Sequence, residues 1–70
     1  MADPGEMCTP APQALAATNA EQLRDVLPQE LLKRSQCQQD SAWLAWVGWA
    51  LNQGGRYTEA VDYLERSLML

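Results

Sequence analysis

The spacing of hydrophobic residues between positions 18 and 35 predicts an amphipathic helix. Residues at i, i+3 and i+4 share one helical face, here Leu23, Val26 and Leu27. Thr18 and Glu21 fit a capping box, in which each side chain accepts a hydrogen bond from the other residue's backbone N–H. Pro28 cannot continue a helix without removing one backbone hydrogen bond. We therefore expect a kinked or broken helix over residues 18–35.

A more hydrophobic helix is predicted over residues 41–53, with Asp40 as its N-cap. Most of its large side chains fall on one arc that is wide enough for a buried face: Trp43, Leu44, Trp46, Val47, Ala50 and Leu51. Gly48 lies at the edge of this arc, where a missing side chain allows another helix to approach closely. Trp49 lies outside the arc, so core packing of this helix does not account for it.

The pair Gly54-Gly55 ends that helix, because glycine adopts positive φ without steric cost. A further helix is predicted over residues 57–70, with one apolar stripe: Tyr57, Ala60, Val61, Leu64 and Leu68. No stretch of the chain alternates polar and apolar residues as a half-buried strand does. The sequence therefore predicts an all-α fold, in which a helix-turn-helix unit follows an N-terminal capping helix.

The first seventeen residues are poor in helix signals. Pro10 and Pro12 exclude a helix interior between them, and Asp3-Pro4-Gly5 is typical of a turn. We therefore expect three parts: a flexible N-terminal tail over residues 1–17, a helical segment over 18–35, and a helical hairpin over 40–70.

Composition narrows the range of functions. The chain has 70 residues, a net charge of −4 and no histidine. It contains no basic cluster of the kind that binds phosphate backbones, so we expect no nucleic-acid partner. The longest apolar run, over residues 42–51, is about half the length needed to cross a bilayer, so we expect no membrane insertion. Without a nucleophile–histidine pair or a phosphate-binding loop, we expect no catalytic residues, metal or cofactor, and no enzymatic activity.

Two cysteines, Cys8 and Cys37, allow one disulfide. Their spacing differs from that of redox or zinc motifs, and free thiols are the alternative. A disulfide between them would tie the N-terminal tail to the turn between two helices and would indicate an oxidising compartment.

The predicted hairpin also carries small and aromatic residues at fixed spacing, Leu44-x2-Val47-Gly48-x2-Leu51, Gly55-x-Tyr57 and Glu59-Ala60, with Leu64 and Leu68 following. Over residues 41–70 this pattern resembles one tetratricopeptide repeat (TPR), a helix-turn-helix unit of about 34 residues. The chain departs from the family at three positions, with Leu44 in place of its frequent tryptophan, Leu51 in place of its frequent tyrosine and Ser67 in place of its alanine near the end of the second helix.

In that family the first helix of each repeat builds the concave, ligand-facing surface. The resemblance therefore implies a partner-binding face at Ala42, Ala45, Trp49, Asn52 and Gln53. Trp49 would anchor a bound peptide, and Asn52 would pair with its backbone groups. The alternative is that Trp49 packs against the N-terminal helix, at Leu23, Leu27 and Leu31, and contacts no ligand.

One repeat of this kind does not bury its apolar face alone. We therefore expect a protein-interaction scaffold that forms the capped start of a longer TPR solenoid and binds a peptide or helix on its concave face. One alternative is a structural module that forms homo-oligomers through Leu64, Leu68 and Leu70. Another is a periplasmic domain of a bacterial envelope export or assembly system. The location would be periplasmic if Cys8 and Cys37 are oxidised and a signal peptide has been removed, and cytoplasmic otherwise.

Overall fold

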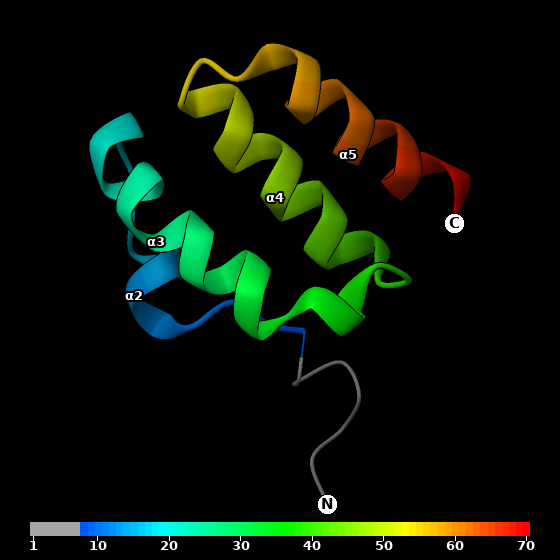
Figure 1. Ribbon diagram of the computed structural model, residues 1–70, viewed down its shortest axis with the longest axis horizontal. Helices are drawn as coiled ribbons and strands as arrows, with labels where there is room; N and C mark the ends of the chain where they lie inside the picture. The colour runs from blue at the N-terminus through cyan, green and yellow to red at the C-terminus, as the bar shows by residue number, and fades with distance from the viewer. Residues whose placement is uncertain (1–7) are drawn as a thin grey trace, which may run out of the picture.

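The computed structural model describes residues 8–70, so the turn expected at Asp3-Pro4-Gly5 lies outside the described residues. All regular structure within residues 8–70 is helical, which confirms the all-α prediction. In chain order the elements are α2 (Pro12–Leu15), α3 (Ala20–Lys33), the 3₁₀ helix η1 (Ser35–Cys37), α4 (Ser41–Gln53) and α5 (Tyr57–Met69). The middle helix, α4, lies between α3 and α5 and runs antiparallel to both (Figure 1).

The prediction of a flexible tail over residues 1–17 is wrong for residues 8–17. Pro12 opens the short helix α2 at a position where its missing N–H costs no hydrogen bond. Ala14 and Ala17 are buried at 1% and 5% exposure. This N-terminal segment, residues 8–17, therefore packs against the helical body as part of the domain.

Helix α3 differs from the sequence prediction at its start and at Pro28. Its N-cap is Asn19 rather than Thr18, and the Asn19 side chain accepts from the backbone N–H of Gln22 at 2.9 Å. The Gln22 side chain in turn accepts from the backbone N–H of Thr18 at 3.1 Å. The first capping bond thus forms one residue later than predicted, and in the second Gln22 replaces Glu21 as the acceptor for the Thr18 N–H. The helix continues through Pro28 without a break, and Pro28 is exposed.

Helices α4 and α5 form an antiparallel hairpin (Figure 1). Asp40 caps α4 as predicted, because its Oδ1 accepts from the backbone N–H of Trp43 at 2.8 Å. The turn that follows α4 depends on Gly55, whose φ of 82° lies in the left-handed region. This conformation brings the Arg56 N–H to the Leu51 carbonyl at 2.9 Å and returns the chain along α4.

The core lies between α3 and α4. Leu23 and Leu27 from α3 meet the buried arc of α4, and α5 contributes little besides Ala60. The buried core residues are Ala17, Leu23, Leu27, Cys37, Trp43, Leu44, Val47, Ala50, Leu51 and Ala60. The predicted arc is therefore confirmed except at Trp46, which is half-buried against this core.

The close approach of α4 and α5 depends on Gly48. A Cβ atom added to Gly48 would lie 2.6 Å from Cγ of Leu64 and 3.3 Å from the carbonyl oxygen of Ala60. Both distances are shorter than ordinary contacts, so a larger residue would push the helices apart. The expectation that Gly48 allows close helix packing is confirmed.

Candidate functional site

The outward side of α4 carries the five residues that the TPR resemblance assigns to partner binding. Ala42, Trp49, Asn52 and Gln53 are exposed, and Ala45 is half-buried. They share this side because the opposite side of α4 faces α3 and the core. The structure thus brings all five predicted residues to one helix surface, the α4 face.

Trp49 is the largest side chain on the α4 face, and 41% of its surface is exposed. The alternative was that it packs against the N-terminal helix at Leu23, Leu27 and Leu31, but Trp49 does not belong to the core cluster that contains Leu23 and Leu27. An exposed tryptophan among small and amide side chains offers a large rigid contact at low entropic cost.

A shallow apolar pocket adjoins the α4 face. Its volume is ≈ 390 Å³, and it lies between the N-terminal segment and the first half of α4. It is lined by Cys8, Thr9, Pro10, Leu15, Asp40, Ala42, Trp43 and Trp46. Ala42 belongs both to this pocket and to the α4 face, so the two surfaces are continuous.

Sequence reasoning missed the pocket because it assigned the N-terminal segment to a flexible tail and Trp46 to the core. Leu15, which forms part of the pocket wall, comes from α2. The one local signal for α2 was Pro12, which suits the first position of a helix. Nothing in the local sequence shows that α2 packs against α3 and brings Leu15 to the pocket.

Two connections hold the N-terminal segment in place. A disulfide joins Cys8 to Cys37, with their Cα atoms 5.7 Å apart, which is one of the two alternatives that the sequence left open. The second connection is Glu30, which is only 3% exposed and accepts a hydrogen bond from the backbone N–H of Ala11 at 3.2 Å. Arg34 neutralises this carboxylate at 2.6 Å. The sequence did not indicate that Glu30 is buried, because a single acidic residue in a helix is ordinarily exposed.

Trp43 lines the pocket, and a residue of α5, Tyr63, packs against its ring. Its ring meets Tyr63 edge-on, with 6.4 Å between ring centroids and 74° between the planes. The guanidinium carbon of Arg66 lies 4.2 Å from the centroid of Tyr63 and so holds that ring in turn. The indole Nε1 of Trp43 is buried and has no hydrogen-bond partner within residues 8–70.

The chemistry of the site is that of a binding surface. Among residues 8–70, Asp40 is the only charged residue that lines the pocket, and its Oδ1 is engaged in capping α4. Residues 8–70 contain no cluster of three or more cysteine, aspartate or glutamate side chains placed to hold a metal ion. What the site offers is aromatic and aliphatic surface with two exposed amides at one end, Asn52 and Gln53.

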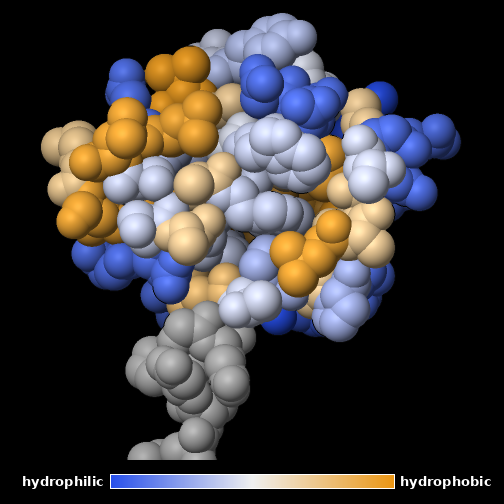
Figure 2. Space-filling view, turned by 180° about the vertical axis from the view of Figure 1, so that it is seen from behind, coloured by the Kyte–Doolittle hydropathy of each residue, from blue (hydrophilic) through white to orange (hydrophobic). Residues whose placement is uncertain are grey.

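The three residues assigned to self-association, Leu64, Leu68 and Leu70, are all exposed, at 38%, 86% and 58%. Figure 2 shows strongly hydrophobic side chains gathered on the side of the molecule where α5 ends. This surface is separate from the pocket, which lies at the opposite border of the α4 face.

No helix within residues 8–70 is both long and apolar enough to cross a bilayer. Comparison of the chain with protein-family models, with curated proteins and with solved structures found no match.

Proposed function

We propose that this protein is an interaction module that binds a peptide or helix of a partner protein on the α4 face, with Trp49 as the anchor. The observation that carries the proposal is the exposure of Trp49, at 41%, beside an apolar pocket of ≈ 390 Å³. The resemblance to a TPR, in which the first helix of a repeat contacts the ligand, supports the same face.

The α4 face and the pocket suit different parts of an extended ligand. The pocket accepts an apolar side chain against Trp46 and Leu15. The amides of Asn52 and Gln53, which lie about two turns beyond Trp46 on α4, pair with backbone groups of the same ligand. Trp49 lies between these two regions and covers the apolar part of the ligand.

Peptide display against the oxidised protein tests the proposal, because it requires no known partner. Selected peptides should shift the NMR signals of α4 residues and of the Trp49 indole. Trp49→Ala should weaken their binding at least about tenfold, which is the usual effect of removing a central aromatic anchor. Circular dichroism should show unchanged helix content, because Trp49 is exposed.

Leu32→Ala provides the matched control. Leu32 is a large hydrophobic residue, 81% exposed on α3, and lies outside the α4 face and the pocket. Its removal should leave peptide binding unchanged. Peptides that bind equally well to the Trp49→Ala variant, or that perturb only α3, would refute the assignment of the α4 face.

A further inference from the structure

The walls of the pocket beside the α4 face carry almost no charge. One wall is the N-terminal segment and the other is the first half of α4, and neither residues 8–17 nor residues 41–53 include a charged side chain. Asp40, which directly precedes α4, is the exception among the described residues that line the pocket. It is half-buried, so it borders both the pocket and the solvent. A ligand in the pocket therefore meets one charge, and that charge is negative.

The carboxylate of Asp40 is only partly engaged. Its Oδ1 accepts from the backbone N–H of Trp43 at 2.8 Å, whereas no hydrogen bond or ion pair from residues 8–70 reaches its Oδ2. The carboxylates that the structure places in ion pairs are those of Glu30, Glu59 and Asp62. The positive end of the α4 dipole amounts to about half a charge, so a net negative charge remains at the pocket.

The positive residues of the chain do not supply the missing partner. Arg66 reaches the loop before α4, but its guanidinium donates to Gln38 and to Asp62. The other positive residues are paired elsewhere or lie on α3, which does not line the pocket: Arg24, Lys33, Arg34 and Arg56. A half-buried carboxylate is stabilised when a cation pairs with it. A ligand can therefore provide the countercharge at Oδ2.

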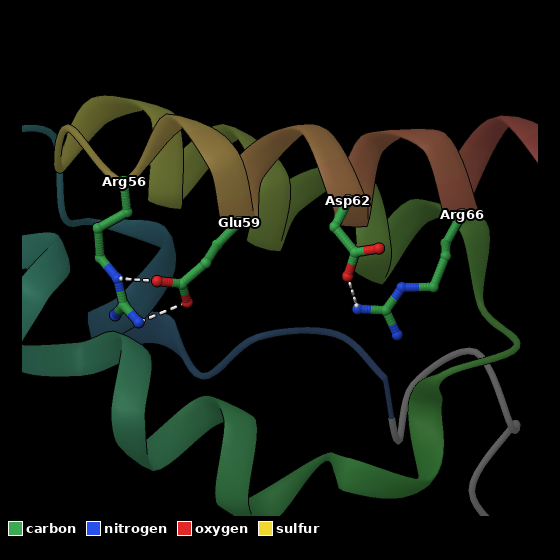
Figure 3. A network of polar contacts seen from close by, with 4 residues as sticks. All are labelled: Arg56, Glu59, Asp62 and Arg66. Carbon is green, nitrogen blue, oxygen red and sulfur yellow. Dashed lines mark hydrogen bonds and ion pairs between the residues drawn. The ribbon is translucent and has the colours of Figure 1, made fainter.

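The aromatic surface of the pocket favours a guanidinium as that countercharge. Trp46 is half-buried and lines the pocket. Indole rings attract cations, arginine stacks on them better than lysine does, and its methylene stem packs on apolar surface. The same combination of groups already occurs on α5. There Arg66 lies 4.2 Å from the ring centroid of Tyr63 and pairs with Asp62 at 2.9 Å, the pair drawn in Figure 3.

We propose that the bound peptide carries an arginine next to the apolar residue that enters the pocket, with the guanidinium on Oδ2 of Asp40 and the methylene stem against Trp46. This inference rests on the proposed function and names the chemistry of the ligand, a basic segment with an adjacent apolar residue. The net charge of −4 supports the same class of ligand, because it steers positively charged peptides toward the chain. An acidic peptide would place a carboxylate near Asp40, where like charges repel.

Parallel peptide selections test the inference. The rise of α4 from Asp40 to Asn52 is about 18 Å, which about six extended residues span, so a library of random decapeptides is long enough. The library is selected against the oxidised parent chain and against an Asp40→Asn variant. Asparagine caps helices as well as aspartate does, so the variant should keep its helix content by circular dichroism. Arginine beside an apolar residue should be enriched by the parent chain and not by the variant.

The affinity of the most enriched peptide then measures the contact directly. Calorimetry compares this peptide with a copy in which citrulline replaces the arginine, which keeps the shape of the side chain and removes its charge. Asp40→Asn should weaken binding of the arginine peptide about fivefold or more and should leave binding of the citrulline peptide unchanged. Added salt should weaken binding of the arginine peptide to the parent chain more than to the variant.

Glu65→Gln is the matched control, because it removes the same charge from an exposed residue of α5 outside the pocket and the α4 face. This variant should bind both peptides like the parent chain. Selected peptides that depend on Trp49 but lack arginine, or that bind the parent chain and Asp40→Asn equally, overturn this inference and leave the proposed function intact. A library without binders, or with binders that Trp49→Ala does not weaken, overturns both.

Discussion

Loss of the disulfide between Cys8 and Cys37 should strongly destabilise this protein. The bond joins residues 29 positions apart and closes a loop that contains α2, α3 and η1. In the unfolded chain this loop restricts the accessible conformations, and removing the restriction stabilises the unfolded state. The folded state meanwhile loses one of the two connections that hold the N-terminal segment against α3 and η1.

The size of the effect follows from the loop length. For a loop of 29 residues, the chain-entropy relation gives about 12 cal/mol/K, or about 3.6 kcal/mol at 25 °C. A domain of 70 residues has a total free energy of unfolding of about 3.5–10 kcal/mol. The disulfide therefore accounts for a third or more of the stability. The corresponding decrease in melting temperature is about 15–30 °C for a domain of this size.

The measurement is urea unfolding followed by circular dichroism and tryptophan fluorescence, for the oxidised chain, the chain reduced with a phosphine, and a variant with Cys8→Ala and Cys37→Ala. Alanine is preferred to serine because Cys37 is 1% exposed and a serine hydroxyl would be buried there. The reduced chain and the variant should agree in midpoint and should show a larger m-value, because the unfolded chain without the disulfide exposes more surface.

The variant also serves as the control for the reductant, which should not change its unfolding curve. The loop-closure relation gives about 3.6 kcal/mol for this disulfide. A free energy of unfolding that falls by less than about 1 kcal/mol on reduction would therefore refute the reasoning. A fall of that small size would mean that the 29-residue loop hardly restricts the unfolded chain.

Two further substitutions test packing and the buried carboxylate. Gly48→Ala should destabilise the fold by about 1 kcal/mol, because overpacking against Leu64 outweighs the gain in helix propensity. In a Leu64→Ala background the same substitution should stabilise the fold. An increase in stability in both backgrounds would contradict the close contact between position 48 and Leu64. Glu30→Ala should cost about 2–3 kcal/mol by leaving Arg34 and the Ala11 N–H without their acceptor. Glu30→Gln should cost less, since its amide oxygen still accepts from Ala11, so equal losses in urea unfolding would show that this hydrogen bond contributes nothing.

The hairpin illustrates what could be predicted locally. The Asp40 cap, the Gly55 turn and the buried arc of α4 each depend on residues within a few positions of one another, and the structure has all three. The start of α3 was wrong by one residue because Thr18 and Asn19 are both good N-caps, and local sequence does not decide between them.

The N-terminal segment illustrates what could not be predicted locally. Residues with two prolines and a run of alanines are typical of a tail, and their propensities give no reason to expect burial. Their order comes from contacts with distant residues: Cys8 with Cys37, and Ala11 with Glu30. The pocket exists only because these contacts bring Leu15 to the side of Trp46.

The same division applies to the candidate surfaces. Hydrophobic spacing alone determined that the chain is all-α, that Trp49 lies outside the buried arc of α4, and that α5 has an apolar stripe, because helical periodicity is a local property. Tertiary structure alone decided which apolar faces are covered. It buried the arc of α4 beneath α3 and left most of the apolar stripe of α5 exposed, because a helix buries its stripe only where another element lies against it.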